Sequence, residues 1–280
     1  MIIGLLGPEG TFSEKAAKLW CSKWNIPSTL QYFTDIPDIV ELVIRDSVDC
    51  GIVPIENSIE GSVGVTLDSL LEYKVNIIGE VIVPIKHCLL ALGKIEDIKV
   101  ILSHPQALAQ CRKYIKKHFK NTETRATGST AHAASLAKYN KEFAAIASAE
   151  CADTYGLKIL ASDIQDHKEN FTRFVVLSKQ YKISFKNLFQ LTNNFKTSII
   201  VYLHKDRPGA LYELLREFAI REINLTKIES RPTKRALGDY LFYIDMIGSV
   251  QDKVIINAIT NIEKKVDRLK VIGSYPRDIP

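Results

Sequence analysis

The chain has 280 residues, of which 46% are hydrophobic and 25% are charged, and its net charge is +5 at pH 7. This composition is typical of a globular protein and excludes a disordered chain, while the length suits one large domain or two ordinary ones. Lysine and arginine are spread along the whole chain, which argues against a nucleic-acid-binding arm. The mild positive excess suits a small anionic substrate.

The cysteines are odd in number and far apart, and they form no C-x-x-C pair and no Cys/His cluster at zinc spacing: Cys21, Cys50, Cys88, Cys111 and Cys151. We therefore expect reduced thiols in a reducing cytosol. Residues 1–6 are apolar but lack the charged segment and the length of a secretion signal. No apolar run approaches the about 20 residues of a membrane span. The expectation is a cytoplasmic protein that binds neither membranes nor nucleic acids.

The first ~180 residues alternate short apolar runs with helical patterns, which predicts an α/β arrangement. Strands are predicted at 2–6, 50–55, 77–85, 89–92, 100–102, 143–147 and 175–177. Predicted helices begin after Thr11, Asp35, Ser103 and Ser129, and another covers 65–71. The first of these starts matches a capping box, with Glu three residues after the threonine, and the two serines are typical N-caps.

One pattern recurs in this region: an apolar strand, one to four small polar residues, and then the start of a helix. It occurs at 7–11, 56–58, 103–106, 129–130 and 148–150. In an open α/β sheet such turns gather at one edge, where ligands bind and helix N-termini offer N–H groups to anions. Helix capping explains each turn taken alone, but five of them in one segment favour a shared polar cleft.

The pattern changes after residues 181–194, which are polar and aromatic without periodicity and are predicted to form a linker. The elements expected beyond it are strand 197–203, helix 210–221, strands 224–230 and 240–247, a helix over 254–262 and strand 268–272. This βαββαβ order predicts a ferredoxin-like α+β domain.

Several cofactor and catalytic signatures are missing from the sequence. The run Gly4-x-x-Gly7-x-x-Gly10 is not a dinucleotide fingerprint, and there is no P-loop, no G-x-S-x-G elbow and no H-E-x-x-H motif. The six histidines are isolated; His104 and His132 lie beside predicted helix starts but are expected to be structural or at the surface. No metal and no cofactor is therefore expected.

The segment Asn170-Phe171-Thr172-Arg173-Phe174 resembles the Thr-Arg-Phe signature of the prephenate dehydratases. Further blocks match the family in the same order: Gly7 to Ser13, Pro54 to Ser58, and Ser103 to Gln106 followed by Gln110. Together they cover nearly all of the first 178 residues. The resemblance implies a two-lobed, periplasmic-binding-protein-like α/β catalytic domain over 1–180, with lobes of roughly 1–75 plus 162–180 and 76–161.

The C-terminal region, 195–275, resembles the ACT domains fused to these enzymes. Two motifs carry this resemblance: Gly209-Ala210-Leu211, and Glu229-Ser230-Arg231-Pro232. In the family these segments bind phenylalanine at a subunit interface. The resemblance therefore implies phenylalanine as an effector that inhibits the enzyme, with those seven residues as its site, and a homodimer or homotetramer formed through the ACT domains.

The family reaction converts prephenate to phenylpyruvate, carbon dioxide and water. Aromatisation drives it, so no electron-sink cofactor is needed. The resemblance implies that Thr172 donates a hydrogen bond, or relays a proton, to the leaving hydroxyl, because a threonine hydroxyl is too weak an acid to act alone. Glu56 is either the source of that proton or a buried or capping carboxylate beside Asn57.

Neutral donors suit a substrate that must lose a carboxylate, since a tight ion pair to that group would stabilise the ground state. The expected substrate-binding residues are Asn57, Ser58, Ser103, Gln106, Gln110, Ser129, Thr130, Phe171 and Arg173. Arg173 is expected either to clamp the retained pyruvyl carboxylate or to pair structurally with an acid such as Asp166.

Two other functions stay open at this point. Arogenate dehydratases perform the same elimination on the amino-acid analogue, and the motifs do not separate them from prephenate dehydratases. A non-catalytic amino-acid-sensing protein is the more distant alternative, because the two-lobed layout resembles solute-binding proteins. The missing signal peptide, the lack of a helix-turn-helix motif and the presence of Thr172 favour an enzyme.

Overall fold

The computed structural model describes residues 1–180, 192, 194–203, 207–233 and 240–279. These fall into two compact units, one formed by 1–67 and 81–174 and the other by 68–80 and 175–279. The predicted linker, 181–194, lies almost wholly outside the described residues.

The first unit begins with a parallel sheet in which β1 (Ile2–Leu6) lies between β2 (Thr29–Phe33) and β3 (Cys50–Asn57). The short β4 (Gly61–Ser62) pairs with β3 on one side, and β11 (Phe171–Ser178) is the neighbour of β3 in the sheet. Helices α1 (Phe12–Lys23), α2 (Ile36–Ile44) and α3 (Gly64–Glu72) connect these strands. Side chains of β1 and β3 are buried, as expected for a sheet with helices on its faces.

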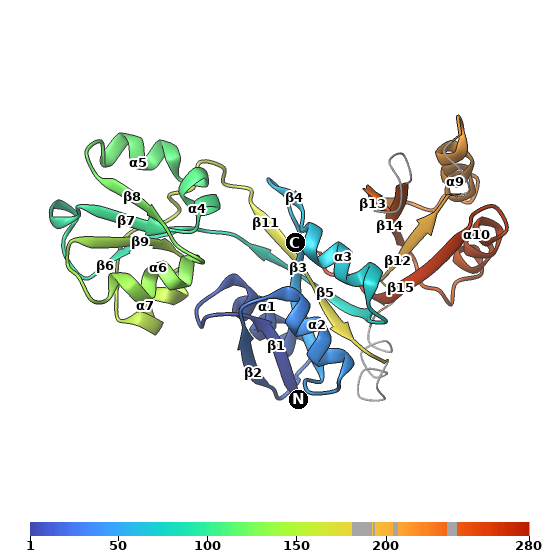
Figure 1. The fold of residues 1–280 in the computed structure, drawn as a ribbon, viewed down its shortest axis with the longest axis horizontal. Coiled ribbons are helices and arrows are strands. Elements are labelled where there is room, and N and C mark those ends of the chain that lie inside the picture. Colours follow the sequence, from blue (N-terminus) through green and yellow to red (C-terminus); the bar gives the residue numbers. More distant parts are fainter. Residues whose placement is uncertain (181–191, 193, 204–206, 234–239, 280) are drawn as a thin grey trace. The chain divides into compact units, whose positions relative to one another are not determined.

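The second sheet of this unit has the strand order β10-β6-β9-β7-β8. Its strands are β6 (Cys88–Ala91), β7 (Val100–Ser103), β8 (Glu123–Ala126), β9 (Phe143–Ala147) and β10 (Lys158–Ala161), with a short 3-10 helix at Ile95–Asp97. Helices α4 (Pro105–Gln110) and α5 (Arg112–His118) pack on one face, and α6 (Thr130–Ala137) and α7 (Glu150–Tyr155) on the other (Figure 1).

The helix starts mostly follow the predicted caps. Thr11 and Ser129 are N-caps whose hydroxyls accept from Glu14 N and His132 N. The prediction of Ser103 as the next cap is wrong by one residue, because the imidazole of His104 accepts from the backbone instead. The predicted helix also breaks at Cys111, the boundary between α4 and α5.

Two strands differ from their predictions in ways that matter for the site. The predicted strand 77–85 is β5 (Asn76–Pro84); it is the neighbour of β11 in the first sheet, whereas it was expected in the second lobe. The predicted strand 175–177 is the longer β11, so the motif residues Thr172 and Arg173 lie on a strand. The domain bounds themselves stay a prediction.

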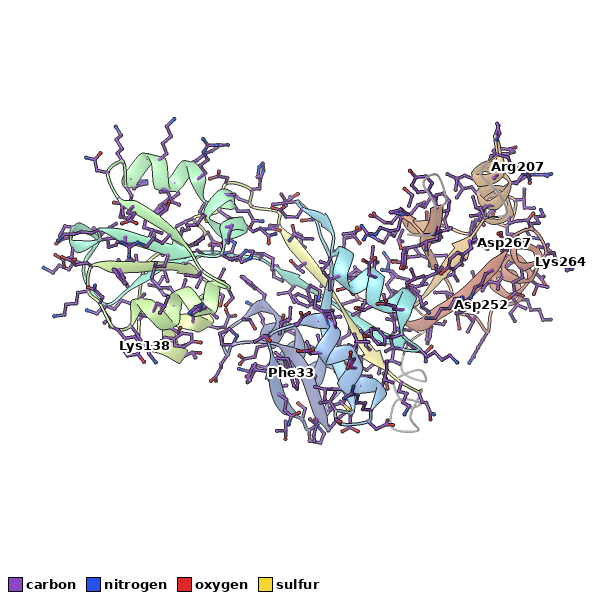
Figure 2. All side chains as sticks on the ribbon, in the orientation of Figure 1. Phe33, Lys138, Arg207, Asp252, Lys264 and Asp267 are labelled. Atoms are coloured by element: carbon purple, nitrogen blue, oxygen red, sulfur yellow. The ribbon has the colours of Figure 1, made fainter. Side chains whose placement is uncertain are left out.

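The C-terminal part has the predicted βαββαβ order, and the fold class is confirmed. Its elements are β12 (Phe195–Tyr202), α9 (Ala210–Ala219), β13 (Leu225–Pro232), β14 (Tyr240–Ile247), α10 (Lys253–Glu263) and β15 (Arg268–Pro276). The strands are antiparallel in the order β13-β14-β12-β15, and both helices pack on one face. Asp252, labelled in Figure 2, precedes α10 and accepts from Ser249 N at 2.7 Å. No helix in the described part of the chain is long and apolar enough to cross a membrane.

Candidate active site

A cavity of about 280 Å³ lies in the first unit and is close in size to the smaller ligand pockets of enzymes. Six of the predicted site residues line it: Asn57, Gln106, Gln110, Ser129, Thr130 and Thr172. The other lining residues are Leu6, Gly7, Thr11, Phe12, Ser13, Thr34, Pro54, Ile85, His87, His104, Ala107, Gly128 and Phe174. The polar turns predicted to share one cleft therefore meet here, except for the turn at 148–150.

The cavity is lined by uncharged types of side chain and by two histidines. The residues that line it, all of them within the described part of the chain, include no Asp, Glu, Lys or Arg. Its polar groups are hydroxyls, amides and the imidazoles of His87 and His104. A charged ligand would therefore be held by neutral hydrogen bonds and by backbone dipoles, not by an ion pair with a lining residue.

Asn57 sets the direction of the hydrogen bond to Thr172. Asn57 Oδ1 accepts from the backbone N–H groups of Ile59 and Glu60, at 2.9 and 3.0 Å. Because a backbone N–H can only donate, the amide nitrogen must point the other way, and Asn57 Nδ2 donates to Thr172 Oγ1 at 2.9 Å. Thr172 Oγ1 is thus an acceptor, and its own proton has no partner among the described residues and can be donated into the cavity.

Glu56 and Arg173 lie on the other face of the same two strands. Successive side chains of a strand point to opposite faces, so Glu56 and Asn57 diverge on β3, as do Arg173 and Thr172 on β11. Arg173 Nη1 lies 3.6 Å from Glu56 Oε2, and neither residue lines the cavity. The structure therefore does not support Glu56 as the proton source or Arg173 as a clamp on the substrate.

The predicted alternative partner of Arg173 is also wrong. Asp166 accepts from the backbone N–H of Lys113 at 3.1 Å and so ties the start of α5 to the returning chain. Arg173 forms its ion pair with Glu56 instead.

Three other predicted substrate-binding residues do not line the cavity and have structural bonds instead. Ser58 N donates to Phe171 O at 2.9 Å and Phe171 N donates to Ser58 Oγ at 3.0 Å, so this pair joins the end of β3 to the start of β11. Ser103 is fully buried, and its hydroxyl donates to Ile146 O at 2.6 Å.

The start of α6 contributes the part of the wall that best suits an anion. Gly128, Ser129 and Thr130 line the cavity at this helix start. A helix N-terminus carries a partial positive charge and unpaired N–H groups, which stabilise a carboxylate without a charged side chain.

Several lining residues were not predicted from the sequence, and His87 is the most informative of them. It is 2% exposed, and burial lowers the pKa of its imidazole. A lone histidine between two apolar runs gives no pattern that indicates a site. Thr11, Phe12 and Ser13 could have been found, since they belong to a motif block that was already recognised.

The strand before the first predicted effector motif, β12, and the strand that carries the second, β13, stop at the same end of the C-terminal sheet. Tyr202 at the end of β12 and Arg231 near the end of β13 both pair with Leu241, so the two strands run in the same direction and end together. The start of α9 follows β12, and its N-cap is Gly209 with φ of 85°, a value that favours glycine. The four residues of the second motif alternate along β13: Arg231 pairs with Asp68 at 3.1 Å, while Ser230 and Pro232 lie on the face of the helices.

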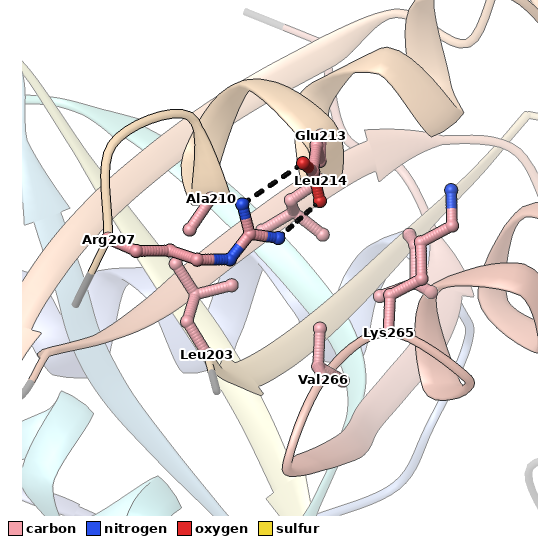
Figure 3. A pocket seen from close by; sticks show the side chains of 8 residues that line it. Leu203, Arg207, Ala210, Glu213, Leu214, Lys265 and Val266 are labelled. Carbon is pink, nitrogen blue, oxygen red and sulfur yellow. Dashed lines mark hydrogen bonds and ion pairs between the residues drawn. The ribbon is translucent and has the colours of Figure 1, made fainter. Parts of the chain in front are cut away.

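A small pocket near α9 is too small for an amino acid. It is lined by Leu203, Arg207, Ala210, Glu213, Leu214, Ile262, Lys265 and Val266, and its volume of about 20 Å³ is room for little more than one water. Arg207 and Glu213 form a two-bond ion pair across it (Figure 3). Of the predicted effector residues only Ala210 belongs to it, so this pocket is not the predicted effector site.

Comparisons with known proteins agree with these observations. The prephenate dehydratase family model matches residues 3–182, and the ACT domain model matches 197–264. A protein named prephenate dehydratase from Methanocaldococcus jannaschii is 43% identical over 272 residues, which is 96% of each chain. One from Arabidopsis thaliana named arogenate dehydratase/prephenate dehydratase 2 is 41% identical over 97% of this chain and 72% of its own length. A crystal structure of prephenate dehydratase from Arthrobacter aurescens in complex with L-Phe superposes with a TM-score of 0.88 at 36% identity, covering 99% of this chain and 90% of that one.

Proposed function

The chain belongs to the prephenate dehydratase family and carries an ACT domain at its C-terminal end, and on this basis we propose that it converts prephenate to phenylpyruvate, carbon dioxide and water. The observation that carries the proposal is the hydroxyl of Thr172. This hydroxyl accepts a hydrogen bond from Asn57, so its own proton can be donated to a ligand in the neutral cavity.

The reaction needs one proton and no oxidant. The bond from the ring to its carboxylate breaks and releases carbon dioxide, and the electron pair moves through the diene. The carbon–oxygen bond on the opposite side of the ring then breaks, and the departing hydroxide takes up a proton to become water. Thr172 donates its hydrogen bond to that oxygen, where negative charge develops, and the proton comes ultimately from solvent. A donor placed at developing charge lowers the barrier more than it stabilises the bound substrate.

The neutral wall suits the other half of the reaction. A carboxylate that is to leave as carbon dioxide must not be held by a fixed cation, and no lining residue in the described chain supplies one. The retained pyruvyl carboxylate is assigned to the start of α6, at Ser129 and Thr130, where the helix dipole stabilises an anion. Gln106 and Gln110 supply further neutral donors.

The same wall favours prephenate over arogenate. Arogenate carries an ammonium group where prephenate has a keto group, and burying an ammonium needs an acceptor of opposite charge. No lining residue among those described is acidic. We expect kcat/KM for prephenate to exceed that for arogenate by at least about tenfold. Steady-state assays of the purified chain with both substrates measure this ratio, and equal or reversed values would contradict the assignment.

The proposal extends to control by phenylalanine through the ACT domain of a homo-oligomer. It is supported by the L-Phe complex of the Arthrobacter protein and by the common end of the sheet at which β12, the strand before α9, and β13 both stop. The predicted effector residues around Gly209 and Glu229 keep their assignment on this basis. Phenylalanine inhibits if it binds more tightly to an arrangement whose catalytic site is less competent.

The test is Gly209→Val in the full chain, with Gly156→Val as a matched control. Both glycines have a positive φ, 85° and 67°, and both have open space where a Cβ would stand, so the backbone strain of the two changes is similar. We expect Gly209→Val alone to abolish phenylalanine binding in calorimetry while the uninhibited activity persists. Retained phenylalanine inhibition in that variant would place the effector elsewhere.

A further inference from the structure

A chain of four buried side chains connects Asn57 to His87. Asn57 Nδ2 donates to Asn170 Oδ1 at 2.9 Å, and Asn170 Nδ2 donates to Gln110 Oε1 at 3.0 Å. Gln110 Oε1 in turn lies 3.1 Å from His87 Nε2. None of the four is more than 8% exposed, so each polar atom depends on its partner in this chain.

The direction of every hydrogen bond in this row of four side chains is fixed from the Asn57 end. The orientation of an amide is ordinarily ambiguous, but Asn57 Oδ1 accepts from two backbone N–H groups, which cannot act as acceptors. Asn57 therefore donates to Asn170, and Asn170 must present its oxygen to Asn57 and its nitrogen to Gln110. Gln110 presents its oxygen, so His87 Nε2 must carry the proton and donate.

This direction leaves the amide nitrogen of Gln110 available to the cavity. Gln110 lines the cavity, and its oxygen is occupied by two donors on the side of Asn170 and His87. Its nitrogen has no partner among the described residues. Gln110 thus offers two N–H groups to a ligand, beside the hydroxyl proton of Thr172.

The rest of the His87 environment fits a neutral ring. Nδ1 is buried and has no hydrogen-bond partner among the described residues, and the ring packs edge to face against Phe12 with centroids 5.8 Å apart. The backbone is held in place, since His87 N donates to Gln165 Oε1 at 2.9 Å. A protonated ring would bury a second N–H without an acceptor, which disfavours the cation.

We propose that His87 is a positioning residue for this active site: as the neutral Nε2–H tautomer it donates to the same oxygen of Gln110 as Asn170 does, and the two donors together hold the glutamine nitrogen towards the substrate. The role rests on the proposed function, in which Gln110 binds substrate. If His87 presented a bare Nε2, Gln110 would turn its nitrogen to the histidine and its oxygen to the cavity. That oxygen would repel a carboxylate, and the glutamine nitrogen would meet the nitrogen of Asn170.

The enzymatic test is a double-mutant cycle between His87→Leu and Gln110→Leu in the full chain. We expect His87→Leu to lower kcat/KM about tenfold and Gln110→Leu to lower it at least as much. The double variant should lose no more than Gln110→Leu alone, because the histidine acts through the glutamine. His87→Gln keeps a donor near Nε2 and is expected within about threefold of wild type, while His87→Asn, whose nitrogen lies near Nδ1, behaves like leucine. The exposed His167→Gln is the control. The proposal would be overturned if the two losses of kcat/KM multiplied in the double variant, or if His87→Gln lost as much kcat/KM as His87→Leu.

A second measurement does not depend on turnover and separates the two proposals. In the full chain labelled with ¹⁵N-histidine, the ring signals lost in His87→Gln identify His87. We expect one protonated and one bare nitrogen, with the proton on Nε2, at about pH 8 and still below the ordinary imidazole value of about 6.5. A proton on Nδ1, or ordinary titration near 6.5, refutes the role of His87 even if the chain turns over prephenate. If the tautomer is as expected but prephenate is not converted, it is the proposed function that fails.

Discussion

On one face of the β3–β11 strand pair Asn57 and Thr172 meet as neutral groups, whereas on the other face Glu56 and Arg173 meet as an ion pair. Glu56 and Asn57 are neighbours in the sequence, as are Thr172 and Arg173. The alternation of side chains along a strand is what places the members of each pair on opposite faces. The neutral face forms the cavity wall and the charged face does not. Proximity in a motif is therefore a poor guide to shared chemistry: the charge beside the candidate catalytic hydroxyl is kept out of the site.

The largest effect is expected on the neutral face, from Thr172→Val. Valine keeps the shape but has no hydroxyl, so the donor to the leaving oxygen is lost while the strand pairing is retained. We expect kcat to fall at least about 100-fold, or about 2.7 kcal/mol of transition-state stabilisation, with KM little changed. The free energy of unfolding should fall by about 1–3 kcal/mol, because Asn57 Nδ2 loses a buried acceptor.

The matched variant is Thr172→Ser, which keeps the hydroxyl and should retain most of the activity. Steady-state kinetics with prephenate and a thermal melt are sufficient. A valine variant that kept more than about a tenth of wild-type kcat would show that this hydroxyl does not act on the leaving group.

Asn57→Asp tests whether the direction of the hydrogen bond matters, not only its presence. The new carboxylate still accepts from Ile59 and Glu60, but it has no N–H to donate. Thr172 would then donate its proton to that carboxylate and lose it for the cavity. We expect kcat to fall about 30-fold, between wild type and Thr172→Val, at unchanged strand pairing. Additive losses in the Asn57→Asp, Thr172→Val double variant would contradict this coupling.

The charged face is expected to affect stability instead of chemistry. Glu56→Gln removes the carboxylate charge that lies 3.6 Å from Arg173, whose side chain is 10% exposed, while the glutamate side chain itself is 36% exposed. Breaking a buried pair is costly, but solvent reaches one partner here, so we expect a loss of about 1–2 kcal/mol in urea unfolding. We expect kcat to stay within about threefold of wild type. Glu60→Gln, at an exposed position nearby, is the control, and a large loss of kcat in Glu56→Gln would restore Glu56 as a proton source.

The sequence was sufficient for the fold class and for six of the nineteen residues that line the cavity. Periodicity found the buried strands and the amphipathic helices, and motif blocks found Thr172, Asn57 and Gln110. It missed β2, β8 and β10, whose side chains are mostly exposed or half-buried, so they give no apolar pattern.

The errors within the site have one cause. Motif membership says that residues are near in sequence, but which face a side chain takes depends on the strand, and Phe171–Ser178 was predicted only from residue 175 onward. Glu56 was placed in a turn after a strand predicted to end at residue 55, whereas β3 continues to Asn57 and gives Glu56 and Asn57 opposite faces. His87 was missed because its partner Gln110 is 23 residues away and Asn170 is 60 residues from that glutamine, contacts that no local pattern reveals.

The smallest expected effect is the pH dependence that His87, in the neutral cavity wall, gives to the free energy of unfolding. Burial lowers the folded-state pKa of His87, while the unfolded chain has the ordinary value of about 6.5. Below that value the unfolded state binds the proton and the folded state does not, so this contribution to stability is fully present above about pH 6.5 and is lost as pH falls towards the folded pKa. The slope is at most about 1.4 kcal/mol per pH unit. Because glutamine does not titrate, the difference in unfolding free energy between wild type and His87→Gln isolates the histidine. We expect the free-energy advantage of wild type over His87→Gln to shrink steadily between about pH 6.5 and 5 in urea titrations. A difference that stayed constant over that range would mean that His87 has an ordinary pKa in the folded chain, and the neutral face would then carry a group that charges in mild acid.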